Sequence, residues 1–332
     1  MTDRLHILRL LAVWLVLLPV FTSCINEDLE ECPQPYSVCF RYDYNMEFAN
    51  LFADEVDNLS VYVFNADGKY LCTFSDRGEA LRKPGYRLPL PLEAGNYRIV
   101  TWAGLEGNDF VPTALQPGVS SPDDLVVTLQ HDGGEVPSDS PLTPLWQANA
   151  ENIIVPEPGE VRTDTLGLVK DTKTIRVILQ RRDGAPIHAA DYGFRIECPR
   201  GNGRLAYDNT LLDEEMLIYR PYSQTETAAT ADTVAHVTAD MSVSRLLVDN
   251  AMRLFVTKAD GESTLVDIPL IGYLLLTQME QDKRIKSNQE YLDRQDFYTI
   301  TLFLEGKPGE EHWFDGLIII NGWALRPSST DL

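Results

Sequence analysis

LSVYVFNADGKYLCTF, residues 59–74, is the stretch that decides the fold. Its two ends, residues 59–64 and 69–74, are rich in β-branched and aromatic residues, which favour β-strands. The residues between them, Asn65-Ala-Asp-Gly68, are of the types that form a short hairpin loop. We therefore predict two antiparallel strands that are neighbours in one sheet.

An alternation of apolar and polar side chains, with a period of two residues, recurs along the chain. Residues 36–44 place Tyr36, Val38, Phe40 and Tyr42 on one face, and residues 172–179 repeat the pattern in the second half. The strongest strands come last, at 297–304 and at 317–322, where both faces are apolar as in a central strand. Shorter candidates are 86–92, 97–102, 125–129, 192–197, 234–238, 253–258 and 264–268.

Helices are scarce in this pattern, with one short helical turn expected within 274–295. Residues 130–158 are rich in Asp, Gly, Pro and Ser, which indicates surface loops with one edge strand around 153–155. Many short strands in two halves predict an all-β protein of two tandem β-sandwiches. We expect the N-terminal β-sandwich over 36–165 and the C-terminal β-sandwich over 166–332.

The first residues have the pattern of a lipoprotein signal peptide. Arg4 and Arg9 precede an apolar run over 10–21, which is shorter than a membrane-spanning helix, and Thr22-Ser23 leads into Cys24. We expect residues 1–23 to be removed, Cys24 to be lipidated and the acidic residues 24–35 to form a tether. An uncleaved signal anchor and an ordinary secretory signal are the alternatives.

The net charge indicates which partners the protein can bind, and the cysteines indicate which bonds they can form in the compartment where the protein lies. The formal net charge of −22 argues against nucleic acid as a partner. Cys32, Cys39, Cys72 and Cys198 would lie in an oxidising compartment, where disulfides persist. We expect one disulfide near the N-terminus among Cys32, Cys39 and Cys72, although two bridges are also compatible with the sequence. A zinc site has no support, since no C-x-x-C pair occurs.

The sequence contains few residues or motifs that indicate catalysis or ligand binding. No nucleophile elbow, zinc-protease motif or phosphate-binding loop is present, so we expect no enzyme, no cofactor and no metal. The isolated histidines and the acidic pairs, such as Glu214-Glu215, fit surface positions. Trp102 and Trp323 end predicted core strands and should pack inside, whereas Trp146 and Trp313 are the candidates for exposed aromatic contacts.

A set of short motifs, in order, carries a family resemblance. They are CINEDLEECP (24–33), FRYDYN (40–45), VYVFNADG (61–68), LEAGNY (92–97), TWAG (101–104), QEYLDRQDFY (289–298) and IIINGW (318–323). The chain resembles the FimB-type family of minor or anchor subunits of type V fimbriae of Bacteroides-like bacteria. The resemblance implies transthyretin-like Greek-key domains, a lipidated N-terminal cysteine and a role at the base of a surface fibre.

The resemblance also implies a location and a mode of assembly. Glu27 and Asp28 resemble signals that send lipoproteins of these bacteria to the outer face of the outer membrane. The partners implied are other fimbrial subunits, joined by β-strand addition, and outer membrane lipid. Shaft subunits of this family lose an N-terminal strand by proteolysis, which here would cut the lipid from the fold. Nine residues follow Trp323, which favours a terminal subunit.

Two other functions compete with a lipid-anchored fimbrial subunit that fixes the fibre and limits its length. A surface glycan-binding lipoprotein would expose Trp146 or Trp313 beside polar residues. A glycosidase would need two carboxylates across a cleft, about 5–10 Å apart.

Overall fold

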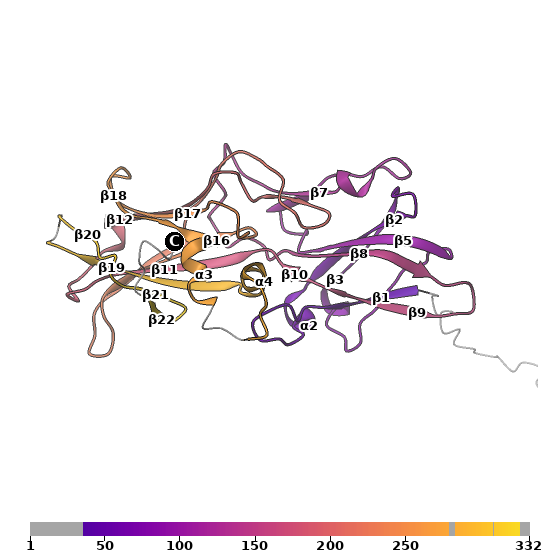
Figure 1. Ribbon diagram of the computed structural model, residues 1–332, viewed down its shortest axis with the longest axis horizontal. Helices are drawn as coiled ribbons and strands as arrows, with labels where there is room; N and C mark the ends of the chain where they lie inside the picture. The colour runs from indigo at the N-terminus through magenta and orange to yellow at the C-terminus, as the bar shows by residue number, and fades with distance from the viewer. Residues whose placement is uncertain (1–35, 279–282, 308, 326–332) are drawn as a thin grey trace, which may run out of the picture. The chain divides into compact units, whose positions relative to one another are not determined.

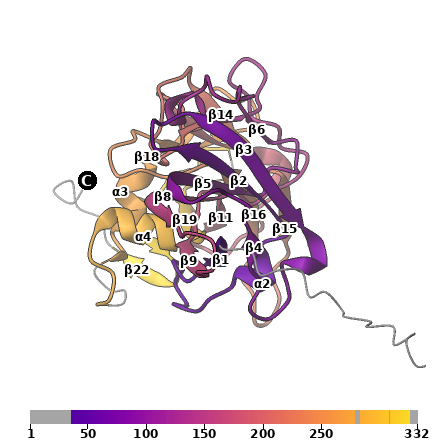
Figure 2. The same cartoon turned by 90° about the vertical axis from the view of Figure 1, so that its right-hand side faces the viewer.

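The computed structural model describes residues 36–278, 283–307 and 309–325. The first half contains two layers (Figure 1). One layer is a three-stranded sheet in the order β4 (Leu88–Pro89), β1 (Tyr36–Arg41), β9 (Arg162–Gly167). The other is a five-stranded sheet in the order β10 (Val169–Lys170), β8 (Trp146–Val155), β5 (Gly95–Ala103), β2 (Asn58–Asn65), β3 (Tyr70–Arg77). Figure 2 shows the larger sheet lying over β1 and β9.

The predicted hairpin is confirmed. β2 and β3 pair antiparallel along their whole length, and Asn65 closes the turn by accepting hydrogen bonds from the backbone N–H groups of Asp67 and Lys69. Gly68 has a φ of 71°, in the left-handed region that glycine adopts most readily. The alternating side chains of β1 and β2 fill the core between the two sheets, together with those of β5 and β8.

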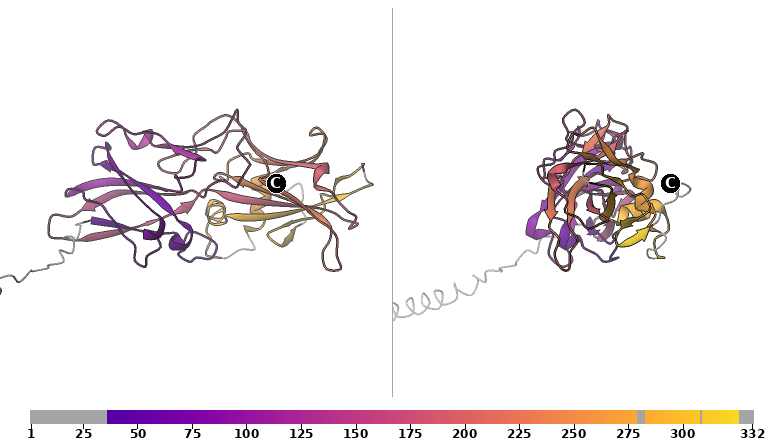
Figure 3. Two further views of the ribbon diagram at one scale, coloured as in Figure 1. Left: turned by 180° about the vertical axis from the view of Figure 1, so that it is seen from behind. Right: turned by 90° about the vertical axis from the view of Figure 1, so that its left-hand side faces the viewer.

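The second half has the same layered form (Figure 3). One sheet follows the order β15 (Ser223–Thr227), β16 (His236–Val243), β11 (Lys173–Arg181), β19 (Phe297–Glu305), β21 (Ile318–Ile320), β22 (Trp323–Leu325), with β20 (His312–Trp313) also pairing with β19. The other follows β14 (Leu217–Tyr219), β12 (Tyr192–Cys198), β17 (Arg253–Lys258), β18 (Thr264–Pro269). The short helices α3 (Leu270–Leu275) and α4 (Asn288–Arg294) precede β19, and α2 (Phe52–Glu55) lies in the first half.

A small third sheet joins the halves. β13 (Arg204–Ala206) belongs to the second half of the sequence but pairs with β7 (Val126–Leu129), which pairs with β6 (Phe110–Pro112). The buried side chains of Phe110, Val127 and Leu129 belong to the same hydrophobic cluster as β11 and β19. The predicted all-β sandwich class is therefore confirmed, with part of the first half packed into the core of the second.

Residues 130–145 form loops as predicted, but the prediction of an edge strand around 153–155 was wrong. The ten-residue strand β8 lies between β5 and β10 inside the five-stranded sheet, not at an edge. Its buried residues include Trp146, Ala148, Ile153 and Val155, whose alternation changes phase after Ala148. The change coincides with a bulge in the β5–β8 pairing and with Asn152 at a φ of 56°. That bulge hid the strand pattern.

Candidate attachment and assembly surfaces

The strand that follows the predicted tether is a central element of the first half. Cys24 and the tether lie outside the described residues, but β1 begins directly after them. Tyr36 and Val38 are completely buried, and Phe40 stacks on Phe52 with ring centroids 5.6 Å apart. The Tyr36 hydroxyl donates to Asp164 Oδ2 at 3.1 Å, and burial with this carboxylate raises the pKa of Tyr36. The chain is therefore fixed to the core from its first described residue.

The loop after β1 reaches the second half through Arg294 of α4. The Arg294 Nη1 atom donates to the backbone oxygens of Asp43 and Asn45 at 3.1 and 3.3 Å. Its guanidinium lies 4.1 Å from the ring centroid of Tyr44 and 4.5 Å from that of Phe48. Phe48 has a φ of 53°, which is strained for an aromatic residue. The contacts of Arg294 hold this loop against α4.

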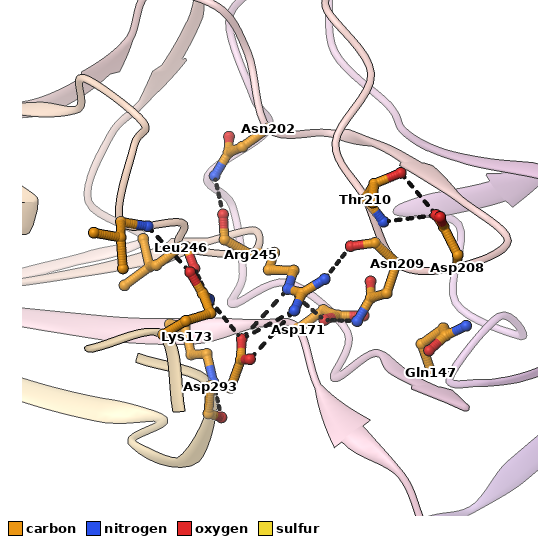
Figure 4. Close-up of polar contacts among 12 residues, drawn as sticks. Gln147, Asp171, Lys173, Asn202, Asp208, Asn209, Thr210, Arg245, Leu246 and Asp293 are labelled. Atoms are coloured by element: carbon orange, nitrogen blue, oxygen red, sulfur yellow. Dashed lines mark hydrogen bonds and ion pairs between the residues drawn. The ribbon is translucent and has the colours of Figure 1, made fainter. Parts of the chain in front are cut away.

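A buried polar cluster fixes the connection between the halves, where β10 leads into β11, to loops and α4 of the second half (Figure 4). The Asp171 carboxylate accepts from Asn209 Nδ2 at 2.9 Å and lies 3.6 Å from Arg245 Nε. Arg245 also reaches Asp293 at 3.2 Å and donates to the backbone oxygen of Asn209. Lys173 Nζ donates to the Asp293 backbone oxygen at 2.6 Å. Buried charges need such partners, because an unpaired one is costly.

Burial sets the protonation behaviour of this cluster. Burial raises the pKa of Asp171 to about 6, although the nearby Arg245 and the Asn209 hydrogen bond oppose the shift. Burial lowers the pKa of Lys173, against the attraction of Asp293. Asp171 and Lys173 are almost completely buried and make their polar contacts within the protein, so we assign the cluster a role in fixing the connection between β10 and β11.

A notch interrupts one sheet of the second half. β14 pairs only with residues 196–198 of β12, so residues 192–195 have no strand on that side in the described part of the chain. Pro221 follows β14 closely, and β15 then pairs in the opposite sheet. The notch opens on a cavity of about 580 Å³ whose lining includes Gly193, Arg195, Arg220, Gln224 and Lys258.

Backbone hydrogen-bonding groups of β12 point into the notch. Gln224 Nε2 donates to the Tyr192 backbone oxygen at 3.0 Å, so that oxygen points into the notch. Backbone direction alternates along a strand, so the N–H and C=O groups of Phe194 point the same way. The cations on its rim are already paired, Arg195 with Glu197 at 2.7 Å and Arg220 with Glu135 at 2.8 Å. What remains is an edge that a further strand can extend.

The predicted aromatic positions were partly wrong. Trp146 is only 2% exposed, since it packs against Tyr42 with ring centroids 6.0 Å apart and beneath the Lys170 ammonium at 5.4 Å. Trp323 was expected inside but is 43% exposed, because β22 is the edge strand of its sheet. Trp313 is half-buried against the core, and Trp102 is fully buried as predicted.

The three described cysteines are free. Cys39 and Cys72 lie half-buried on different sheets and Cys198 is buried, so no bridge joins any pair of them. Cys32, the remaining member of the predicted disulfide set, lies outside the described residues. Burial raises the pKa of the Cys198 thiol to about 12.

Within the same described residues, no group of His, Cys, Asp or Glu side chains is arranged to hold a metal ion. His131 is the best-connected histidine and lies 3.8 Å from Glu214 and 3.7 Å from Glu215. None of the helices in the described ranges has the length and apolar character needed to cross a bilayer.

Solved structures with this fold come from species of Bacteroides and Porphyromonas. The chain is 33% identical to a putative polysaccharide-binding protein of Bacteroides thetaiotaomicron, with a TM-score of 0.76 over 90% of this chain and 99% of that one. It is 32% identical to a putative adhesin of the same organism, with a TM-score of 0.79 over 91% and 100% of the two chains. No curated protein matches.

Similarity to a fimbrial anchor extends to the fold. The fimbrial anchor protein Mfa2 of Porphyromonas gingivalis has a TM-score of 0.68 over 90% of this chain and all of its own, at 19% identity. The family model of the fimbrillin-A associated anchor proteins Mfa1 and Mfa2 matches residues 29–327. The chain therefore belongs to the family of fimbrillin-A associated anchor proteins, whose role is structural and not enzymatic.

Proposed function

We propose that this protein is a lipid-anchored subunit that attaches a surface fimbria to the outer membrane and limits its length. The burial of β1 carries the proposal. A chain that is lipidated at Cys24 and enters the core at Tyr36 is held to the membrane by an element that cannot leave without exposing Val38 and Phe40. Two or three acyl chains would hold Cys24 almost permanently, because each buried CH₂ contributes about 0.8 kcal/mol.

The test is a substitution of the acylated cysteine. Cys24→Ala should move the protein from the outer membrane fraction to the soluble fraction and leave its unfolding temperature unchanged. Cys32→Ala is the matched control, since it removes a cysteine from the same segment and should stay with the membrane. Recovery of Cys24→Ala in the outer membrane fraction with residues 1–23 removed would exclude lipid anchoring, and mass spectrometry of the N-terminal peptide would identify both the cleavage and the modification directly.

We propose that other fimbrial subunits join this protein by adding a β-strand at the notch beside β12. The free backbone groups of Phe194 support this site, since β-augmentation is based on main-chain hydrogen bonds. Gln224→Trp places a bulky ring in the notch and removes the hydrogen bond to Tyr192. Thr227→Trp, on the exposed part of the same strand, is the control. Fimbrial subunits should co-purify with the control and not with Gln224→Trp; equal recovery would place the joint at another edge.

The length-limiting role has its own readout. Cells that lack the protein should carry longer or detached fimbriae in electron micrographs, because no subunit terminates the fibre at the membrane. Unchanged fibre length in such cells would remove this part of the proposal while leaving the anchor role intact.

A glycan-binding role remains the second candidate, because the relative at 33% identity is described as a putative polysaccharide-binding protein. The burial of Trp146 weakens it. Retention on immobilised surface polysaccharides that is lost in Trp313→Ala would favour this role instead.

A further inference from the structure

We propose that two parallel strand pairs of the described residues, β1–β9 and β11–β19, are mechanical clamps: the first resists a pull between the tether and the second half, and the second resists a pull on the strands after β19. The proposal rests on the anchor function above, which places a pulling force between the tether and the fibre. In each half, the strand that enters the fold pairs in parallel with a strand at the end of that half. All the neighbouring pairs of the five-stranded sheet between β10 and β3 are antiparallel, so these two parallel pairs stand apart.

Chain direction decides how force acts on the first clamp. Tension from the tether pulls β1 from its N-terminal end at Tyr36. The second half is joined to β9 through its C-terminal end at Gly167, so tension from the fibre pulls β9 the opposite way. Two parallel strands pulled at opposite ends slide along each other. All the pairs from Tyr36↔Arg162 to Arg41↔Gly167 are then loaded together, whereas strands pulled from the same end separate pair by pair.

Side chains reinforce the end of this clamp that faces the tether. Ser37 Oγ lies 2.9 Å from Thr163 Oγ1, and Tyr36 donates to Asp164 as described above. Both contacts bridge β1 to β9 within the first pairs of the ladder. At the other end, the Leu168 backbone N–H donates to the Arg41 backbone oxygen at 2.7 Å. The clamp is therefore bonded at both ends.

The second clamp repeats the arrangement. β11 receives tension at its N-terminal end, and β19 runs parallel to it over the register Thr174↔Phe297 to Arg181↔Leu304. Lys173, at the start of β11, donates to the Asp293 backbone oxygen just before β19. This clamp is loaded when the partner holds the strands after β19. A partner strand in the notch beside β12 loads the first clamp only, and does so after the contacts of β13 with β7 and of Arg294 with the loop after β1 have broken, because these contacts also join the halves.

Single-molecule force spectroscopy tests the proposal on the soluble chain from residue 25 onward, with its cysteines replaced by serine. Pulling between the two termini loads the clamps in shear. A second attachment through Val161→Cys, an exposed position just before β9, pulls Tyr36 and Arg162 apart from the same end. We expect a several-fold higher rupture force for the terminal geometry. Equal rupture forces would overturn the proposal, and that result would not affect the lipidation test at Cys24.

A matched pair of proline variants distinguishes the loss of a hydrogen bond in the β1–β9 ladder from a general loss of stability. The backbone oxygen of Arg41 faces β9. Because backbone groups of alternate residues point the same way, the N–H of residue 39 also faces β9 and takes part in the ladder, and Cys39→Pro removes it. The outward N–H of Thr165 lies on the free edge of β9, where proline is tolerated. The rupture force should fall in Cys39→Pro and persist in Thr165→Pro. A similar fall in both would assign the effect to stability and contradict the clamp; if Cys39→Pro does not fold, the comparison of pulling geometries decides alone.

Discussion

Truncating Phe40 to alanine should weaken the packing of β1 against the core of the first half. The Phe40 ring is 5% exposed, stacks on Phe52 at 5.6 Å and lies 6.4 Å from Tyr86. Phe→Ala changes at sites buried to this degree remove the transfer free energy of the ring and leave a cavity, at a cost of about 3–5 kcal/mol. This cost includes the energy of the lost aromatic contacts with Phe52 and Tyr86. Because whole domains are stable by only about 5–15 kcal/mol, the first half should become marginal.

Denaturant unfolding of the soluble chain from residue 25 onward measures the effect. Phe40→Ala should lower the denaturant midpoint of the transition that involves the first half, with limited proteolysis cutting next to β1 before other sites. Arg41→Ala is the matched control, since its side chain is 55% exposed and its loss should cost less than about 0.5 kcal/mol. A loss below about 1 kcal/mol in Phe40→Ala would refute the view that β1 is a core element.

Three further predictions follow from the contacts between the halves and from the buried thiol. The folded chain binds the Asp171 proton more tightly than the unfolded chain, so this group makes the protein less stable as pH rises from about 4 to about 6. The stability of Asp171→Asn relative to the natural chain should therefore increase by about 2 kcal/mol over that range in unfolding titrations. Arg294→Ala should cost about 1–3 kcal/mol, because it removes two hydrogen bonds and two aromatic contacts, whereas Arg77→Ala, with 75% of its side chain exposed, should cost almost nothing in thermal unfolding. Cys198 should resist thiol reagents until the chain unfolds, while Cys39 and Cys72 react in the native state, and early labelling of Cys198 would contradict its burial.

Much of the strand content could be predicted because alternation is a local signal. Ile175, Val177 and Leu179 are fully buried on β11 as their spacing predicts, and the turn between β17 and β18 lies where the sequence places it. β8 was missed because its bulge breaks the alternation and its exposed face is polar. Strand length near the end of the chain was overestimated, since β21 covers only three residues.

Pairing between distant strands had no local signal. Nothing in the spacing of residues 36–41 shows that they lie beside residues 162–167, or that β13 crosses to pair with β7. The same holds for the assembly surface. The notch beside β12 exists because β14 ends after Tyr219, and a missing strand leaves no mark in the sequence of the strand that lacks it. Trp146 was misplaced for a related reason, because its burial depends on Tyr42 and Lys170 from other parts of the chain.

The first strand links these observations. The family resemblance implies that shaft subunits lose an N-terminal strand by proteolysis, whereas the corresponding cut here would separate Cys24 from the fold and open the core beside Phe40. Parallel pairing of β1 with β9 turns a pull on the tether into sliding along the ladder, and forced separation is governed by the unfolding rate and not by equilibrium stability. An anchor needs slow release under tension more than it needs high stability. Under the proposed anchor role, β1 is therefore retained for its mechanical strength as well as for its link to Cys24.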